Sequence, residues 1–229
     1  MTPRGTLWLH VGTHKTGTTS IQEAVAQRRA ELAAAGVAIW PERNAQQLAN
    51  HFIRPSLWTI PRMLGISAPV DLAVFDELAA RLDEARGGAD DLFISSQEFC
   101  MMRDALEAQV LRGTLMQVFR RVVPIVAFRD VHDWRASRAD ELNRIGMWER
   151  QDSLPDTLSS DGDWYYDPLA IRRFWAQIGE VTEIDYDAAT ARDGSILPEF
   201  ARALGHEGLF DGLDLRLNRR GDAVIEDEA

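Results

Sequence analysis

The sequence of 229 residues contains a single cysteine, Cys100, and no long hydrophobic run. One cysteine can form no disulfide within the chain and no cysteine-based zinc or iron–sulfur site, which is typical of proteins from a reducing compartment. No stretch approaches the roughly 18 apolar residues of a membrane-spanning helix, and the N-terminus lacks the apolar core of a signal peptide. We therefore expect a soluble, cytoplasmic protein.

The chain also lacks an excess of basic residues. Its 25 Lys and Arg residues are outnumbered by 36 Asp and Glu residues, which gives a formal net charge of -11. An acidic surface argues against broad binding to nucleic acid, although a local pocket can still be basic and take a small anion. The length and the 45% of hydrophobic residues predict one globular domain over residues 1–229. The pattern leaves the oligomeric state open.

Short apolar runs alternate with amphipathic segments along the chain. Strands are predicted over residues 6–11, 37–40, 91–96, 122–128 and 181–186. Helices are predicted over residues 18–35, 72–86, 104–120, 130–150, 168–178 and 195–204. This alternation predicts an α/β fold with a mainly parallel central sheet and helices on both faces.

The order of the strands also predicts where a ligand binds. In such sheets the ligand lies beyond the carboxyl ends of the strands, so the loops after Val11, Ser96 and Phe128 are expected to share the functional edge. Pro124 interrupts the strand predicted over 122–128 and argues against a central place for that strand, because proline cannot donate to a sheet ladder.

Two segments fit the alternating pattern less well. Within residues 41–90, the stretch 43–69 contains Pro55 and Pro61 among scattered apolar residues, which predicts short helices or a lid-like excursion before the helix at 72–86. Residues 151–163 are polar with proline and glycine and predict an exposed loop. Both segments are expected to shape the pocket of a substrate, whereas the acidic tail at 222–229 is expected to be frayed.

A glycine-containing loop occupies residues 12–19, with the sequence GTHKTGTT, between a predicted strand and a predicted helix. Glycines allow successive backbone N–H groups to face one anion, and the N-terminus of the following helix adds a favourable potential. The loop differs from the nucleotide-binding GxxxxGK[ST] motif, because Thr18 stands where that motif has lysine. Ser95 and Ser96 also stand where a magnesium-binding carboxylate is expected, which argues against a metal-assisted kinase.

The stretch LHVGTHKTGTTSIQ resembles the 5′-phosphosulfate loop of sulfotransferases, whose core is Lys-x-Gly-Thr-Thr. These enzymes use 3′-phosphoadenosine 5′-phosphosulfate (PAPS). A second motif of the family is an arginine at a strand end with a serine eight positions later, and Arg129 and Ser137 have that spacing. The similarity is strongest at residues 7–22 and 92–138, and the chain looks most like the compact bacterial sulfotransferases, which have a P-loop-like fold.

The resemblance implies a set of residues for the co-substrate. The loop would bind the 5′-phosphosulfate, Arg129 and Ser137 would hold the 3′-phosphate, and a basic segment with Arg219 and Arg220 would close over it. The candidate loop residues are His14, Lys15, Thr16, Gly17, Thr18 and Thr19.

The resemblance also implies a reaction. The sulfuryl group would pass in line from PAPS to a hydroxyl or amine, releasing adenosine 3′,5′-bisphosphate, while Lys15 stabilises the bridging oxygen without any metal. A base should take the proton of the acceptor. Glu98, just after the strand at 91–96, and His51 are the two candidates.

The pattern leaves the acceptor open among small molecules, lipids and carbohydrates. Two other functions also remain at this point. One is a small-molecule kinase that uses ATP and magnesium on a related fold, and the other is a relative without catalytic activity that binds a nucleotide or a partner protein. Binding of nucleotide with or without magnesium would discriminate the first, and binding without turnover would indicate the second.

Overall fold

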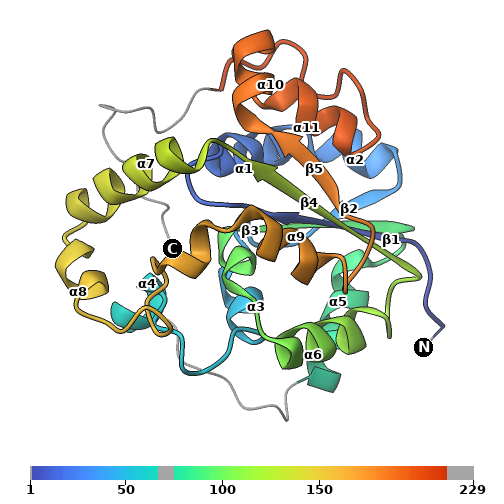
Figure 1. Cartoon of the computed structure of the whole chain (residues 1–229). Coiled ribbons are helices and arrows are strands. Elements are labelled where there is room, and N and C mark those ends of the chain that lie inside the picture. The colour runs from blue at the N-terminus through green and yellow to red at the C-terminus, as the bar shows by residue number, and fades with distance from the viewer. Residues whose placement is uncertain (1, 67–74, 216–229) are drawn as a thin grey trace.

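The predicted apolar runs form the strands of one sheet in which every strand pair is parallel (Figure 1). The computed structural model describes residues 2–66 and 75–215. In these residues the strand order is β2-β3-β1-β4-β5. The strands are β1 (Thr6–Val11), β2 (Val37–Ile39), β3 (Asp91–Ser96), β4 (Arg121–Phe128) and β5 (Thr182–Asp185).

Helices cover both faces of the sheet, as Figure 1 shows. One face carries α1 (Thr18–Gln27), α2 (Arg29–Ala34), α10 (Tyr186–Asp193) and α11 (Leu197–Ala203). The other carries α3 (Gln46–Asn50), α5 (Phe75–Arg86), α6 (Ala105–Leu115) and α9 (Pro168–Trp175). Beyond the carboxyl end of β4 come α7 (Val131–Arg144) and α8 (Trp148–Asp152).

The side chains of strand β1 show why an apolar core lies on each face of the sheet. Leu7, Leu9 and Val11 are buried in the core that includes Trp175 of α9. The alternate residue His10 points to the opposite face and packs its ring against Phe200 of α11. Side chains alternate along a strand, so a run that is apolar on both faces needs a helical layer on each side. The expected α/β fold with a mainly parallel sheet is therefore confirmed.

Several predicted helices are shorter than the pattern indicated. The helix predicted over 18–35 is interrupted at Arg28, where φ is -102° and ψ is 22°. The helix predicted over 130–150 is broken at Gly146, which has a φ of 67° and separates α7 from α8. Helix α6 ends at Leu115 rather than near 120, and α10 was not predicted. Helical periodicity continued through these breaks, so it did not reveal them.

The inference from Pro124 is wrong, because β4 lies between β1 and β5. The pairing with β5 begins only at Ile125, which is opposite Thr182. Pro124 pairs in register with Leu9 of β1 and meets no β5 residue. Gly179 fills the space on that side, where a Cβ would come within 2.0 Å of the Val122 carbonyl oxygen. Proline is tolerated here because no hydrogen bond to β5 is lost.

The described part of the 43–69 stretch forms short helices, as predicted: α3 and α4 (Ile60–Met63). A buried guanidinium, that of Arg62, holds this segment together. It donates to the Asn50 side chain at 2.9 Å and to four main-chain carbonyls. Those carbonyls belong to Asn50, Ile53, Arg54 and Leu57. One side chain thereby satisfies the polar groups of an irregular stretch that has no sheet partner.

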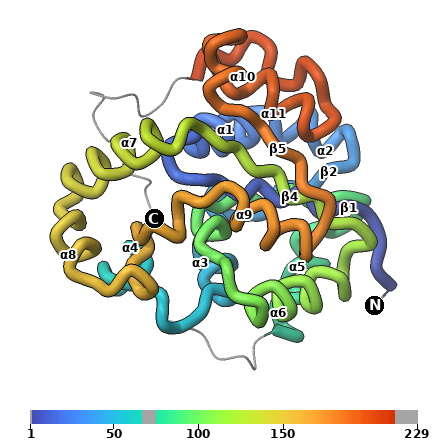
Figure 2. The backbone as a smooth tube through the Cα atoms, in the orientation of Figure 1, coloured from blue at the N-terminus to red at the C-terminus, as the bar shows by residue number. Residues whose placement is uncertain are grey.

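The prediction of an exposed loop at 151–163 is wrong for its central residues. Ser159 and Ser160 are buried, and the Gln151 side chain accepts from the Ser159 hydroxyl at 2.7 Å. The Gln151 amide donates to the Trp58 carbonyl at 3.0 Å, so this segment packs against the α4 region (Figure 2). Polar residues can be buried once their hydrogen bonds are made within the protein. Among the described residues, no helix is long and apolar enough to cross a bilayer.

Candidate active site

The loops after β1, β3 and β4 meet at the carboxyl edge of the sheet, as predicted. The Gly12 N–H donates to the Ser96 carbonyl at the end of β3, at 3.2 Å. The Thr13 hydroxyl donates to the Ala127 carbonyl near the end of β4, at 2.5 Å. The glycine loop is thus fixed to the strands on both sides of β1.

The loop turns sharply into α1. Gly17, the residue that caps α1, has a φ of 79°, and an added Cβ would lie 3.0 Å from Ile196. Lys15 has a φ of 67°, and no other described non-glycine residue has a positive φ. A lysine in this region is unfavourable, so the surrounding bonds must hold the turn in place. One such bond joins the Thr16 hydroxyl to the Thr13 carbonyl at 2.7 Å.

A cavity of about 550 Å³ lies over the N-terminus of α1. It brings together residues of both sequence motifs, which come from the loop and from the segment after β4. From the predicted set, its lining includes Lys15, Gly17, Thr18, Thr19, Arg129 and Ser137. A helix N-terminus, one ammonium and one guanidinium then face the same space, which suits an anion with more than one charged group.

Two buried polar atoms of this lining have no hydrogen-bond partner within the described residues. They are the Thr18 hydroxyl oxygen and Nε of Arg129. Another nitrogen of Arg129, Nη1, donates to the Lys15 main-chain carbonyl at 3.1 Å, and the guanidinium lies 5.4 Å from the ring centre of Tyr186. Unpaired buried donors are costly, so a phosphate oxygen in the cavity would satisfy groups that the protein leaves unpaired.

Carboxylates also line the cavity. Glu141 of α7 forms an ion pair with Lys15, with 3.7 Å between Nζ and Oε1. Its other oxygen accepts from Nη1 of the buried Arg138 at 2.6 Å. Burial opposes the ionisation of Glu141, but the neighbouring charges, above all that of Arg138, lower its pKa to about 2. Glu141 is therefore an anion at neutral pH.

The side chain of His14 in the loop is buried and does not line the cavity. Its Nδ1 is 2.6 Å from the Tyr165 hydroxyl, which also accepts from the His14 N–H at 3.1 Å. Burial, assisted by the charge of Arg138, lowers the pKa of His14 well below its usual value. Burial also raises the pKa of the neighbouring Cys100 thiol to about 12, so the thiol stays protonated. Thr16 likewise bonds within the loop and is not part of the cavity lining.

Glu98 follows β3 in the short 3-10 helix η2 (Gln97–Met101). Its side chain is buried and does not line the cavity, although the preceding residue, Gln97, does. Burial raises the pKa of Glu98 to about 7, although the charges of Arg138 and Arg62 oppose that shift. A carboxyl that titrates near neutrality is suited to take a proton from an acceptor.

His51 is half-buried at the C-terminus of α3 and does not line the cavity. Its Nδ1 has no hydrogen-bond partner within the described residues. Burial, together with the charge of Arg81 on α5, lowers the pKa of His51. Arg219 and Arg220, like the tail at 222–229, lie outside the described residues, although Leu215 lines the cavity.

The lining residues that the sequence analysis missed include Gln97, Glu141 and Tyr186. Glu141 could have been found, because it follows Ser137 by four positions on one helix and therefore shares its face. Gln97 directly follows a strand at the expected edge. Tyr186 gave no comparable signal, since its place depends on how α10 packs.

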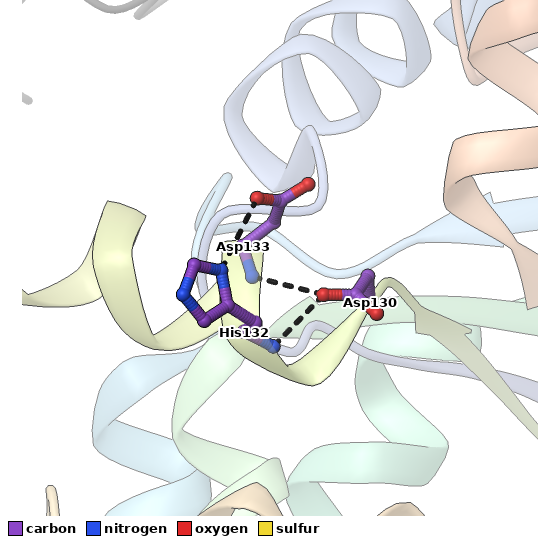
Figure 3. Close-up of side chains that lie close together, drawn as sticks. All are labelled: Asp130, His132 and Asp133. Carbon is purple, nitrogen blue, oxygen red and sulfur yellow. Dashed lines mark hydrogen bonds and ion pairs between the residues drawn. The ribbon is translucent and has the colours of Figure 1, made fainter.

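Three exposed side chains at the start of α7 come close enough together to be considered as metal ligands (Figure 3). The Asp130 carboxylate accepts from the N–H groups of His132 and Asp133, at 2.9 and 3.1 Å. This is the hydrogen bonding of a helix N-cap, which Asp130 provides for α7. We assign no metal to this cluster, because capping accounts for its arrangement.

The fold and the site define a class: a parallel α/β protein with a glycine loop between β1 and α1 that opens into a cavity. The crystal structure of a sulfotransferase from Alicyclobacillus acidocaldarius has a similar fold, with a TM-score of 0.59 over 96% of this chain and 87% of that chain. The two sequences are 16% identical. The chain thus has the fold of a sulfotransferase, as the two motifs implied. No family model and no curated protein matches the sequence.

Proposed function

We propose that this protein is a sulfotransferase that moves the sulfuryl group of PAPS to a hydroxyl or amine of an acceptor. The observation that carries the proposal is the shared cavity, in which Lys15 comes from the glycine loop and Arg129 and Ser137 come from the β4–α7 segment. PAPS carries phosphate at two places on one adenosine, so it needs two separate anion-binding groups at one site. A loop for a single phosphate would not require the second group.

The lining fits this co-substrate in its chemistry and size. The cavity of about 550 Å³ lies within the range of small-molecule sites, roughly 300–1,000 Å³. The Thr18 hydroxyl and Nε of Arg129 would gain partners from phosphate oxygens. Ser137 lies two helical turns into α7 and would add a hydroxyl donor beside the guanidinium of Arg129.

In the proposed reaction, an acceptor oxygen or nitrogen attacks sulfur while the bond between sulfur and the bridging oxygen breaks. The electron pair of that bond stays on the bridging oxygen, which becomes part of adenosine 3′,5′-bisphosphate. The Lys15 ammonium and the N–H groups at the start of α1 stabilise the developing charge there. The chain supplies these positive groups itself, so the proposal includes no metal.

The proton of the acceptor passes to Glu98 in this scheme. The raised pKa of about 7 leaves a large fraction of this carboxyl ionised and basic at neutral pH. His51 is the other candidate base, and its unpaired Nδ1 is compatible with that role. The acceptor is a small molecule, lipid or carbohydrate with a hydroxyl or amine group.

The test is calorimetric titration with adenosine 3′,5′-bisphosphate, first in EDTA and then in magnesium, with ATP for comparison. We expect binding of the bisphosphate without metal, and at least tenfold weaker binding in Arg129→Ala. Arg112→Ala is the matched control, because Arg112 is exposed on α6 and does not line the cavity. Binding of ATP that depends on magnesium, without binding of the bisphosphate, would overturn the proposal in favour of a kinase.

A further inference from the structure

Both the main chain and the side chain of Lys15 contact charged residues. Its main-chain carbonyl accepts from Arg129, and its ammonium lies 3.7 Å from Oε1 of Glu141. Neither side chain of that ion pair is freely exposed, with exposed fractions of 16% for Lys15 and 25% for Glu141. A flexible four-carbon side chain is thereby restricted on the wall of the cavity.

The Glu141 carboxylate is also held by a second residue, Arg138. Its two carboxylate oxygens are divided, with Oε2 bonded to Arg138 and Oε1 facing Lys15. The Arg138 side chain is only 3% exposed, and its Nε lies 3.9 Å from a carboxylate oxygen of Asp161. Four side chains of alternating charge therefore follow one another in space and end at the cavity: Asp161, Arg138, Glu141 and Lys15.

The presence of Glu141 in this cavity requires an explanation. Among the described lining residues, the positive charges of Lys15 and Arg129 are matched by the negative charges of Asp133 and Glu141. A carboxylate in the cavity lining repels a phosphate, so Glu141 weakens the binding of an anion unless it improves another contact. The separation of 3.7 Å exceeds a hydrogen-bond distance, so the three N–H donors of Lys15 are not committed to Glu141.

We propose that Glu141, clamped by Arg138, is a positioning residue that holds the Lys15 ammonium where it meets the bridging oxygen of the phosphosulfate. This inference rests on the proposed function and assigns a role to a residue outside both sequence motifs. Ordering a lysine in advance removes an entropic cost from binding and from the transition state. The Glu141 carboxylate thereby keeps the Lys15 ammonium at the loop before the anion binds.

The test is a double-mutant cycle on the binding of adenosine 3′,5′-bisphosphate, measured by calorimetry in EDTA. It uses the wild type, Lys15→Ala, Glu141→Gln and the double variant. Glutamine keeps the size of the side chain and an oxygen for Arg138, but it removes the charge. If Glu141 acts through Lys15, Glu141→Gln weakens binding when Lys15 is present. When Lys15 is absent it leaves affinity unchanged or raises it, because only the repulsion is removed, so the two effects differ by about tenfold.

Equal effects in the two backgrounds would overturn the inference, since Glu141 would then act only as a repelling charge or as a structural residue. Asp140→Asn is the matched control: Asp140 is an exposed neighbour on α7 outside the lining, and its effect should be the same in both backgrounds. If Glu141→Gln does not fold by thermal melting, Glu141→Asp replaces it. That variant keeps the charge and withdraws it from Lys15, so a smaller coupling is expected, and additivity again overturns the inference.

The cycle also separates two kinds of failure. If the wild type does not bind the bisphosphate, the proposed function fails and this inference fails with it. If the wild type binds the bisphosphate and the cycle is additive, the proposed function stands and only the role of Glu141 is wrong.

Discussion

The guanidinium of Arg129 donates a hydrogen bond to the main-chain carbonyl of Lys15, with 3.1 Å between Nη1 and the oxygen. This bond joins two motifs that lie 114 residues apart in the chain. The arginine proposed to bind the 3′-phosphate therefore also supports the turn that presents the lysine. A change at either residue is expected to affect both ends of the co-substrate.

Lys15→Ala is expected to lower sulfuryl transfer by about 100- to 1,000-fold, because the charge that stabilises the leaving oxygen is removed. The φ of 67° is unfavourable for alanine as it is for lysine, so the fold should be preserved. PAPS consumption with an accepted substrate measures the rate, and a melting temperature near that of the wild type is the control. Turnover close to that of the wild type would show that Lys15 does not perform this role.

Arg129→Ala is expected to weaken binding of adenosine 3′,5′-bisphosphate by about 10- to 100-fold, the range for loss of hydrogen bonds to a charged group. Part of this loss comes from the bond to Lys15, so binding of adenosine 5′-monophosphate should also weaken, but to a smaller extent. Calorimetry with both compounds measures the difference. Equal losses for the two nucleotides would contradict a contact between Arg129 and the 3′-phosphate.

Glu98→Gln is expected to remove the rise in transfer rate through pH 7 that the wild type should have. A base must be deprotonated, and burial raises the pKa of Glu98 to about 7, so the wild-type rate increases as pH passes that value. A pH–rate profile from pH 5 to 9 in the two proteins, at saturating PAPS, measures this. If the variant kept the same rise in rate through pH 7 as the wild type, Glu98 would not be the base and His51 would be the remaining candidate.

Glu98→Gln should also stabilise the fold at high pH. The pKa is raised from 4.5 in the unfolded chain to about 7 in the folded protein, so the folded state binds more protons between these values. The stability of the wild type therefore falls as pH rises from 4.5 to 7, by up to about 3 kcal/mol. Urea unfolding of both proteins at pH 5 and pH 8 tests this. The advantage of the variant should be larger at pH 8, and an equal or smaller advantage there would contradict the burial of an ionised carboxylate.

Arg62→Met is expected to lower the free energy of unfolding by about 3–4 kcal/mol, because it removes the hydrogen bonds that the guanidinium donates to the Asn50 side chain and to several buried carbonyls. The apolar stem of methionine fills most of the volume, so the loss reports the removed Arg62 hydrogen bonds. Chemical denaturation measures it, with Arg112→Met on the surface of α6 as the control. A change below about 1 kcal/mol would mean that water replaces the guanidinium.

Local patterns predicted the parts of this protein that depend on neighbouring residues. The strands predicted at residues 6–11 and 91–96 have the bounds of β1 and β3. The loop between β1 and α1 was also found in the expected place. In each case the signal lies within about ten residues, where side-chain alternation and glycine conformation act.

Pairings between distant segments were not predicted in the same way. The sequence suggested an exposed loop at 151–163, but Gln151 is buried because Trp58 and Ser159 satisfy its amide. It argued against a central place for β4, but β5 begins to pair only at Ile125, so Pro124 loses no hydrogen bond to β5. Burial of polar groups depends on partners that are remote in the chain, and residue type alone does not specify those partners.

The sequence by itself determined the class of fold, the glycine loop and the spacing of Arg129 and Ser137, because alternation, helical periodicity and turn chemistry are local properties. Only the tertiary structure decided that these residues share one cavity with Glu141 and that Glu98 is buried. The charge of a side chain is fixed by its type, whereas its pKa and its partner depend on packing. For that reason the raised pKa of Glu98 and the ion pair of Lys15 follow from the folded arrangement of β3, α7 and the loop after β1.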